Sequence, residues 1–526
     1  MIMIRRAVAA LALAHALSGA AGAATLRFVP DADLAIVDPV VSTAITTQNH
    51  ALMVYDVLFA PDAEWRIRPQ MIEAYETSAD GLTWIFTLRP GLRFHDGGSV
   101  GARDAVPSIE RWGKTNTFGR LMMQHVAAIE AASDNRFVIR LKSPFAPLLD
   151  AIGASQNPLF IMREKEALAP ADKAVPEVVG SGPFAFDRAG WKPGHSITYR
   201  RFTDYKPRSE PPSGLAGAKI AKVDTVEWLY IPDPATATQA LINGEVDILD
   251  QPSADLVPLL RRSAGVEVAT IDRLGNQLIL RPNHLVPPFN DVRVRQALLL
   301  AADQEPFLSV VQGDTALRRP CWSVFLCGTP LETTAGQAHA GLSRAEAVTR
   351  VKALLAEAGY KGEPVVLISP SDRPAFKAMG VVAEQLLTEA GFTVNHQVMD
   401  WATLVQRRAS KEAPSASRAG WSLFPAWGTG PTMSNPFMNT TAPTPCDGRN
   451  YFGWPCDERL EAIRKEYLTA VSPEQRRDVN ERFHRRFFEV VPYVPVGQVL
   501  QPTAYRRELK GVLPDIRLSL WNIEKP

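Results

Sequence analysis

Aromatic side chains are concentrated in one short segment of the chain. Trp421–Trp427 (WSLFPAW) holds three aromatic residues in seven positions, and the Gly- and Pro-rich segment 428–431 follows it. Tryptophan and phenylalanine offer large apolar faces, and the tryptophan edge adds a hydrogen-bond donor. A loop of this composition suits the wall of a cleft that holds a small, partly hydrated ligand. The alternative for each ring is ordinary packing in a hydrophobic core.

The four cysteines of the chain lie in two local pairs. Cys321 and Cys327 are six residues apart, and Cys446 and Cys456 are ten residues apart. In an oxidising compartment each pair can close a small loop, and such a loop stabilises the fold by about 2–3 kcal/mol. A four-cysteine zinc site is the alternative, but neither pair has the C-x2-C spacing that such sites favour. We expect two local disulfides, because both loops contain Gly, Pro or aromatic turn residues.

Signatures of catalysis are scarce. The sequence has no phosphate-binding GxxxxGK[ST] motif, and Gly180-Ser181-Gly182 lacks the spacing of the G-x-S-x-G nucleophile motif. The histidines are scattered without metal-ligand spacing, and His95-Asp96 belongs to a turn with the two glycines that follow. We therefore expect no catalytic residues, no metal site and no cofactor. The 56 acidic residues leave a pair of glycosidase carboxylates open as an alternative.

The N-terminal segment predicts export from the cytoplasm. Arg5-Arg6 precede the apolar run Ala7–Leu17, and Ala21-Gly22-Ala23 forms an A-x-A cleavage site. This is the pattern of a signal peptide, 1–23, that is cut after Ala23. The apolar run is too short to span about 30 Å of hydrocarbon. Because the net charge is only +1, the chain has no basic field, and we expect no nucleic-acid partner.

Strands and helices alternate on both sides of a break at Gly275. This alternation predicts two α/β lobes. Before the break we expect strands at 25–29, 135–141, 196–201, 223–231 and 246–249, and helices at 49–58 and 234–243. After it we expect strands at 276–280, 364–368, 392–399 and 493–498, and helices at 291–302, 343–358, 373–390 and 473–488.

Two further segments have a distinct local pattern. Trp84–Arg89 and Leu92–His95 alternate apolar and polar residues on either side of Pro90-Gly91, which predicts a hairpin followed by a polar loop and a helix start. In the segment 283–303, Asp291 stands at the position of a helix cap before an amphipathic helix.

Five segments together resemble a known family. They are LRPGLRFHDG (88–97), GSGPFAF (180–186), ALINGEVDIL (240–249), FNDVRVRQALLLAAD (289–303) and LLAEAGY (354–360). In this order they resemble the bacterial extracellular solute-binding proteins of family 5, the periplasmic proteins that feed peptide- and nickel-type ABC importers. The resemblance covers nearly all of the mature chain. It implies an α/β fold of the type II periplasmic binding proteins, with two lobes, mixed sheets flanked by helices, an extra subdomain and an interlobe cleft.

The resemblance also implies how the chain is divided. Lobe I would comprise residues 24–275 plus 492–526, with 49–178 as the extra subdomain, and lobe II would comprise 276–491. The chain would cross between the lobes near Arg273–Asn276 and near Val491–Val496.

The resemblance implies that the protein binds and delivers a solute without catalysing a reaction. The protein would capture a peptide or peptide-like solute in the cleft and deliver it to an ABC permease in the inner membrane, as a periplasmic monomer that is not an enzyme. A carrier of a metal chelate on the same fold and a secreted hydrolase are the alternatives. The candidate ligand contacts are Tyr55, Asn49, Trp421, Phe424, Trp427, Gly430 and Asn435.

One departure from the family pattern concerns the ligand. Peptide binders of the family carry an Asp three residues after a Trp in this loop, and that carboxylate pairs with the α-amino group of the peptide. Here Phe424 follows Trp421 and Gly430 follows Trp427 at that distance. An unpaired buried ammonium is costly, so we expect that ordinary free-amine peptides are not held through this contact. Blocked or modified peptides, or another solute, stay open.

Overall fold

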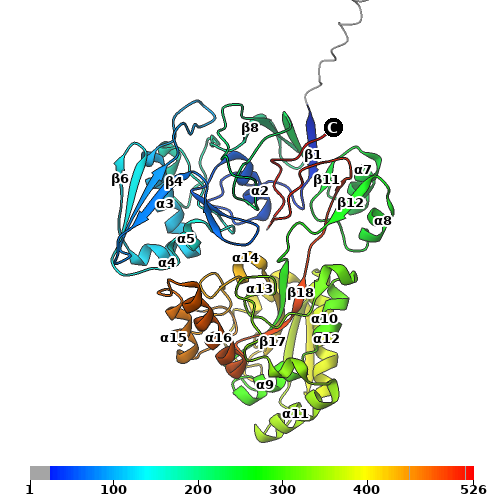
Figure 1. The fold of residues 1–526 in the computed structure, drawn as a ribbon. Coiled ribbons are helices and arrows are strands. Elements are labelled where there is room, and N and C mark those ends of the chain that lie inside the picture. Colours follow the sequence, from blue (N-terminus) through cyan, green and yellow to red (C-terminus); the bar gives the residue numbers. More distant parts are fainter. Residues whose placement is uncertain (1–23, 449, 516) are drawn as a thin grey trace, which may run out of the picture.

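The computed structural model describes residues 24–448, 450–515 and 517–526, and the chain forms two α/β lobes, one above the other in Figure 1. The expected signal peptide, 1–23, lies outside the described residues. Within the described part of the chain, no helix has both the length and the apolar character needed to cross a bilayer.

Lobe I is organised around a seven-stranded mixed sheet. Strand β1 pairs in parallel with β10 on one side and with β11 on the other. The strand–helix–strand unit β10-α7-β11 therefore has parallel strands with β1 between them, and helix α7 (Pro234–Asn243) ends at Gly244 with φ 77°. The strand order is β12 (Val266–Ala269), β19 (Thr503–Arg506), β11 (Ile248–Leu249), β1 (Thr25–Val29), β10 (Thr225–Leu229), β9 (Ser196–Arg201) and β8 (Phe184–Lys192). Helix α8 (Val257–Arg262) packs against β12.

The first helix of lobe I begins earlier than predicted. Helix α2 spans Ile45–Val54, whereas the sequence indicated 49–58. The helix ends where another segment packs against its last turn, because the Gly182 amide donates to the Val54 carbonyl at 2.8 Å. A Cβ at Gly180 would lie 1.9 Å from that same carbonyl oxygen, so only glycine permits this approach.

A four-stranded antiparallel sheet forms a separate part of lobe I, drawn in blue and cyan in Figure 1. The predicted hairpin at Trp84–His95 is wrong, since β5 pairs with β4 and β7 while Arg93 forms a single bridge to Ser99. The four alternating residues 92–95 are too few to form a strand of their own. The strand order is β4 (Ile72–Thr77), β5 (Thr83–Leu88), β7 (Arg136–Leu141) and β6 (Val126–Ser133), and the smaller elements are β2 (Phe59–Pro61), β3 (Ile67–Pro69), α3 (Ala102–Thr115), α4 (Thr117–His125), α5 (Leu148–Ile152) and α6 (Glu164–Ala167).

Lobe II holds a six-stranded mixed sheet covered by helices. The predicted helix cap at Asp291 is confirmed, since its side chain accepts from the Arg293 amide. In addition, Ser343 and Glu346 form a capping box, and Gly391 ends its helix at φ 103°. The strand order is β14 (Arg318–Arg319), β18 (Val494–Val499), β13 (Asn276–Pro282), β17 (Leu423–Thr429), β15 (Val365–Pro370) and β16 (Val394–Met399). The helices are α9 (Val292–Ala301), α10 (Gln304–Val311), α11 (Arg344–Glu357), α12 (Pro374–Ala390), α13 (Trp401–Arg407), α14 (Gly430–Met433), α15 (Glu458–Glu466) and α16 (Pro473–Val490).

The aromatic segment expected as a loop belongs to a strand inside this sheet. Strand β17 (Leu423–Thr429) pairs with β13 along its length, with Leu280 opposite Pro425. On its other side it meets β15 at one position, Leu367 opposite Leu423. Beyond that position this side of β17 resembles a sheet edge, which is where a strand tolerates proline.

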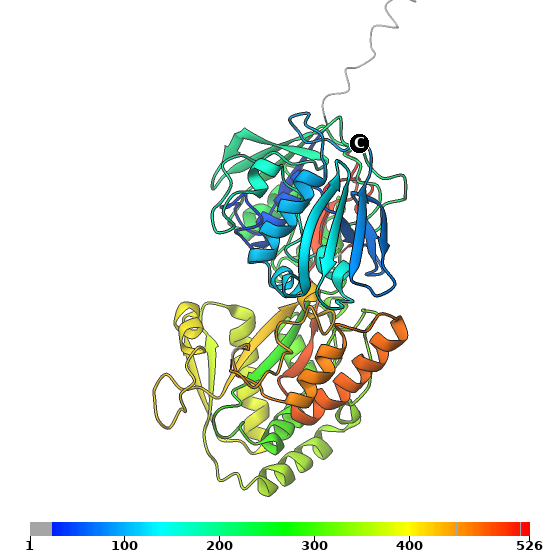
Figure 2. The same ribbon diagram turned by 90° about the vertical axis from the view of Figure 1, so that its left-hand side faces the viewer.

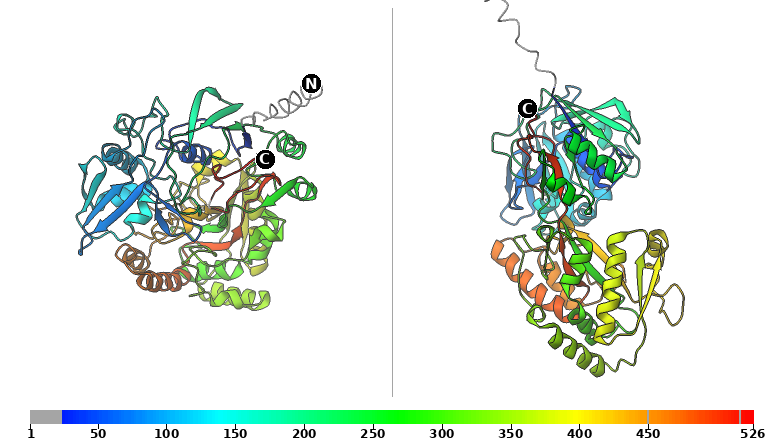
Figure 3. Two further views of the ribbon diagram at one scale, coloured as in Figure 1. Left: turned by 45° about the horizontal axis from the view of Figure 1, so that its top comes forward. Right: turned by 90° about the vertical axis from the view of Figure 1, so that its right-hand side faces the viewer.

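The chain crosses between the two sheets twice, at a waist visible in Figures 1 and 3. The first crossing leads into β13, which begins at Asn276. The second lies between β18, which ends at Val499 in the sheet of lobe II, and β19, which begins at Thr503 in the sheet of lobe I. This return falls later in the chain than Val491–Val496, because β18 pairs with β13. We call the two crossing segments the hinge.

Both expected disulfides are confirmed. Cys321–Cys327 and Cys446–Cys456 are bonded, with Cα atoms 5.9 and 4.6 Å apart. Since these bonds use all four cysteines, the four-cysteine zinc alternative is wrong.

Candidate functional site

A cavity of about 1090 Å³ lies between the two lobes. Its lobe I side includes Trp65, Trp84, Asp150 and Ser155, from the four-stranded sheet and the segments beside it. Its lobe II side includes Glu332, Asn435, Tyr467 and Arg476. The volume is at the upper end of the range for small-molecule sites, and the lining mixes aromatic rings with a few charged groups, as such sites do.

The outer rim of the cavity is closed by direct contacts between the lobes. In Figure 2, helices α15 and α16, in orange, lie below the four-stranded sheet. The Asp150 carboxylate of α5 accepts from the Arg476 guanidinium of α16 at 3.2 Å, and the Ala146 amide donates to the Leu468 carbonyl at 2.8 Å. The same guanidinium lies over the Tyr467 ring.

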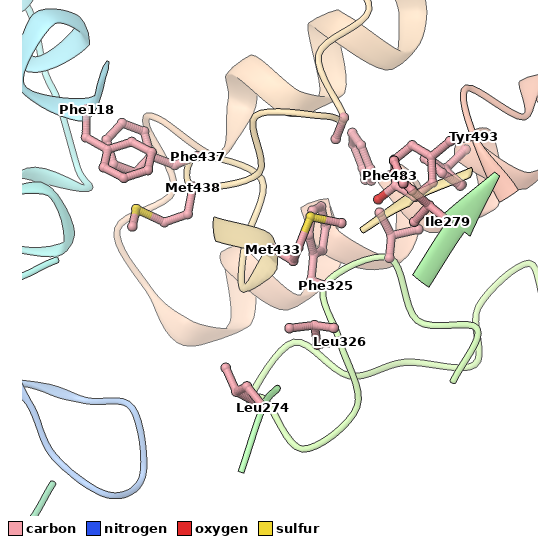
Figure 4. Close-up of a cluster of buried hydrophobic side chains, with 14 of the residues drawn as sticks. Phe118, Leu274, Ile279, Phe325, Leu326, Met433, Phe437, Met438, Phe483 and Tyr493 are labelled. Carbon is pink, nitrogen blue, oxygen red and sulfur yellow. The ribbon is translucent and has the colours of Figure 1, made fainter. Parts of the chain in front are cut away.

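An aromatic contact extends this closure. The Phe437 ring of lobe II lies 5.3 Å from Phe118 and 5.7 Å from Phe145, both of lobe I, and Figure 4 shows Phe118 and Phe437 facing each other. We call these residues, with Asp150 and Arg476, the clasp. The cavity is therefore bounded by the hinge on its inner side and by the clasp on its outer side.

A group of charged side chains lies in lobe I beside the first hinge segment, and we call Asp31, Asp250, Asp272 and Arg517 the charged wall. The Arg517 guanidinium donates to Asn49 Oδ1 at 3.3 Å and to Gln156 Oε1 at 3.4 Å. Burial lowers the pKa of Arg517 and raises the pKa of each of the three carboxyls. For Asp250 burial, helped by the charge of Asp31 and opposed by Arg517, raises the pKa to about 7.

The charged wall adjoins the cavity through two short connections. Ser155 lines the cavity, and its neighbour Gln156 accepts from Arg517. On the hinge side, the Asp272 carboxylate accepts from the Leu274 and Gly275 amides, and the Gly275 carbonyl accepts from the Gly430 amide at 2.7 Å. Pro431, the next residue, lines the cavity.

The structure brings three of the candidate ligand contacts to the charged wall, the cavity or the hinge. Asn49 is bonded to Arg517, Asn435 lines the cavity, and Gly430 lies at the hinge. The Asn435 side chain also accepts from the Phe437 and Met438 amides, which fixes the clasp segment. Trp427 is 37% exposed and packs on one side against Phe376, with ring centroids 4.6 Å apart.

The other three candidates are core residues, and here the expectation that they contact the ligand is corrected. Tyr55, Trp421 and Phe424 are at most 1% exposed. Tyr55 packs against Phe160, and the Trp421 ring packs against Phe424 and Trp454. The segment was taken for a loop, whereas Phe424 lies in a strand with a sheet neighbour on each side and Trp421 directly precedes it. The core alternative holds for these rings.

Sequence reasoning missed a cluster of side chains around Trp427. The Phe376 and Trp401 rings stack at 5.7 Å, and the guanidinium groups of Arg373 and Arg408 lie 5.6 Å from the Trp401 ring centroid. Arg373 and Trp401 closely follow β15 and β16, two parallel strands. The sequence therefore contained a signal for this cluster, because residues that follow the carboxyl ends of adjacent parallel strands meet at one edge of the sheet. Asp400 caps α13 by accepting from the Thr403 amide.

A Ser–His–Glu arrangement bears on the hydrolase alternative. Ser369 Oγ lies 2.7 Å from His396 Nε2, and His396 Nδ1 lies 2.8 Å from the Glu384 carboxylate. However, Ser369 is 0% exposed, and a Cβ at Gly380 of α12 would lie 2.7 Å from the Ser369 Cβ. A nucleophile must be reached by its substrate. This arrangement is covered by α12 and ties it to β15 and β16.

Comparisons with known proteins agree with this architecture. The family model described as bacterial extracellular solute-binding proteins, family 5 Middle, matches residues 66–444. A protein of Sinorhizobium fredii named as a probable peptide ABC transporter periplasmic-binding protein is 36% identical over 495 residues, which cover 94% of this chain and 92% of that relative.

Solved structures share the fold. The ABC transporter substrate-binding protein CtaP from Listeria monocytogenes superposes with a TM-score of 0.78 at 18% identity, over 95% of this chain and 99% of that one. The binding protein AgaA from A. tumefaciens R10, solved with agropinic acid, gives a TM-score of 0.72 at 23% identity, over 95% and 99% of the two chains. The predicted α/β, two-lobed fold is thereby confirmed.

Proposed function

The chain belongs to the bacterial extracellular solute-binding proteins of family 5, and we propose that it captures a peptide or peptide-like solute between its lobes for an ABC importer. The observation that carries this proposal is the cavity of about 1090 Å³, lined from both lobes between hinge and clasp. Lobes joined by two short crossings can close on a solute by hinge motion. The closed form then docks on a permease of the inner membrane.

The chemistry of the cavity supports a peptide-like solute. Trp65 and Trp84 offer apolar faces to side chains, and the lining also carries charged groups of both signs. A peptide presents both apolar and charged groups. The relative of this chain in Sinorhizobium fredii is named as a probable peptide ABC transporter periplasmic-binding protein. The family consists of solute-binding proteins and not of enzymes, and we propose that this chain likewise releases its solute unaltered.

The remaining parts of the proposal follow the family. We assign residues 24–275 and the C-terminal segment that begins with β19 to lobe I, with 49–178 as an extra subdomain, and residues 276–499 to lobe II. The boundary between lobe II and the C-terminal segment lies later than the expected residue 492, because β18 pairs within the sheet of lobe II. The protein works as a periplasmic monomer, exported by a signal peptide that is cut after Ala23.

The test is a thermal-shift screen of the mature protein against peptides, opines, sugars and metal chelates, with hits measured by calorimetry. A solute at 100 times its dissociation constant should stabilise the fold by about 2.7 kcal/mol. A hit among peptides, recovered unchanged after incubation, supports the proposal. A hit confined to metal chelates replaces the peptide class with the chelate alternative. No hit in any class, together with hydrolysis of a supplied ester or peptide, overturns the proposal.

A further inference from the structure

Asp250 of the charged wall is a buried carboxylate without a hydrogen-bond donor. It is 7% exposed, and within the described part of the chain no group donates to its side chain. Buried carboxylates are normally paired or hydrogen-bonded, because removing the charge from water is otherwise costly. Among the described residues, Asp250 therefore lacks a hydrogen-bond donor for its carboxylate.

The position of Asp250 is fixed by the sheet of lobe I. Strands β1 and β11 are adjacent and parallel, with Val29 opposite Leu249. Asp31 follows the carboxyl end of β1 after one proline, and Asp250 follows β11 directly, with its amide donating to the Val29 carbonyl at 3.1 Å. Residues that follow adjacent parallel strands meet at one edge of the sheet, which is where α/β folds bind their ligands. Asp31 and Asp250 thus meet at the same edge of the lobe I sheet, close enough for the charge of Asp31 to act on Asp250.

The charges around Asp250 do not balance. The groups that act on it are Asp31, which has the same sign, and Arg517, which has the opposite sign. Arg517 is shared, since Asp272, Asp515, Asp250 and Asp31 all act on its guanidinium, and Asn49 and Gln156 hold it in place. One guanidinium beside Asp31, Asp250 and Asp272 leaves an excess of negative charge at this edge.

We propose that Asp31 and Asp250 form a subsite for a cationic group of the solute, namely a primary ammonium such as the α-ammonium of a peptide. This proposal rests on the proposed function and names the charge that its solute must carry. The ammonium lies against the two carboxylates, and a neighbouring oxygen of the solute faces the Arg517 guanidinium.

A bare metal ion fits this edge less well than an ammonium. In the described residues, no three His, Cys, Asp or Glu side chains are grouped as metal ligands. The Arg517 guanidinium would repel a divalent ion, whereas it complements an ammonium that is attached to an oxygen-bearing solute. Burial and the like charge of Asp31 raise the pKa of Asp250, and an ammonium bound beside it would lower that pKa by stabilising the ionised carboxylate.

The test compares amine-bearing solutes with their N-acetylated forms, using a pool of free-amine tripeptides and the same pool after acetylation. The proteins are the wild type, Asp250→Asn, Asp31→Asn and the control Asp255→Asn, whose exposed carboxylate bonds to Ser253 in the same segment. We expect the wild type and the control to bind the free-amine pool about tenfold or more tightly than the acetylated pool, as for a charge-assisted hydrogen bond. In Asp250→Asn and Asp31→Asn most of this difference should disappear.

The outcomes separate the two proposals. Equal binding of both pools by the wild type, or an unchanged preference in Asp250→Asn, overturns the cation subsite and leaves the proposed function standing. Binding of neither pool overturns the peptide assignment together with the subsite. Folding of each variant is checked by its melting temperature, and Asp31→Asn provides a second test if Asp250→Asn does not fold.

Discussion

The Asp150 carboxylate of α5 and the Arg476 guanidinium of α16 form a 3.2 Å ion pair that joins the two lobes at the outer rim of the cavity. The side chains are 23% and 26% exposed, so water screens the pair only partly. It belongs to the clasp, on the side of the cavity opposite the hinge. A contact of this kind exists only while the lobes are close together, so it biases the protein toward the closed arrangement.

Removing this ion pair should weaken solute binding. We expect Arg476→Gln to raise the dissociation constant about two- to fivefold, because a partly exposed pair contributes at most about 1 kcal/mol and acts only on the closed form. Calorimetry gives the affinity, and small-angle scattering gives the radius of gyration, which should increase. The matched control is Arg477→Gln, whose exposed side chain also borders the cavity. Equal affinities and equal radii for the wild type and Arg476→Gln would show that the pair does not hold the lobes together.

The buried carboxyl of Asp250 should impose a pH dependence on stability. Burial raises its pKa to about 7, so between about pH 4 and pH 7 the folded protein binds a proton that the unfolded chain has lost. The free energy of unfolding therefore falls as the pH rises through 7. We expect Asp250→Asn to melt a few degrees above the wild type at pH 8 and close to it at pH 5.

This prediction is tested on the difference between the melting temperatures of Asp250→Asn and the wild type at each pH. Buried histidines such as His50 and His484, whose pKa values burial lowers to about 3 and about 4, affect both proteins equally. Their contribution cancels when the two melting temperatures are subtracted at each pH. A difference that does not change between pH 5 and pH 8 would contradict the raised pKa of Asp250.

Local signals predicted much of the fold. Helices α9, α11 and α12 begin or end at Asp291, Ser343 and Gly391 because capping depends on residues within one turn. Strand β17 was missed because Pro425 usually excludes a central strand, and its tolerance depends on how far β15 extends beside it. The burial of Trp421 likewise depends on Trp454, a residue distant in sequence.

The charged wall illustrates what a sequence alone does not contain. Asp31 and Arg517 come from opposite ends of the chain, and no spacing relates them. The absence of an acidic residue at positions 424 and 430 led us to expect that free-amine peptides are not held from lobe II. The carboxylates at the sheet edge of lobe I offer such an amine a different partner, which only the folded topology reveals.

The longer disulfide loop should contribute measurably to stability. The bond Cys446–Cys456 closes a loop of ten residues, and the Arg281 guanidinium holds this region by donating to the Thr441 and Phe452 carbonyls. We expect the double variant Cys446→Ser/Cys456→Ser to lose about 2–3 kcal/mol of unfolding free energy. Denaturant unfolding measures the loss. Dithiothreitol should lower the stability of the wild type more than that of the variant, and an equal effect on both would contradict the prediction.

Ser369 should matter for stability and not for catalysis. In Ser369→Ala the His396 ring loses its partner at Nε2, and an unsatisfied buried nitrogen costs about 1–3 kcal/mol. We expect a lower melting temperature, unchanged solute affinity and no hydrolysis of p-nitrophenyl esters by either protein. The control Ser371→Ala removes an exposed hydroxyl two residues away. Ester hydrolysis by the wild type that Ser369→Ala abolishes would restore the hydrolase alternative.

Gly275 should be the most sensitive position of the hinge. Its φ is 56°, and a Cβ there would lie 2.0 Å from the Val499 carbonyl oxygen, so the two crossing segments can approach each other only at glycine. In Gly275→Ala the two crossing segments must move apart. This movement also distorts the hydrogen bond that the Gly430 amide donates to the Gly275 carbonyl. We expect a loss of about 2 kcal/mol or more in unfolding free energy, together with at least tenfold weaker solute binding, because the lobes no longer meet in the same geometry. The control Gly313→Ala places its methyl group in open space and should change neither quantity. If Gly275→Ala binds solute like the wild type, the close approach of the crossing segments does not determine how the lobes close.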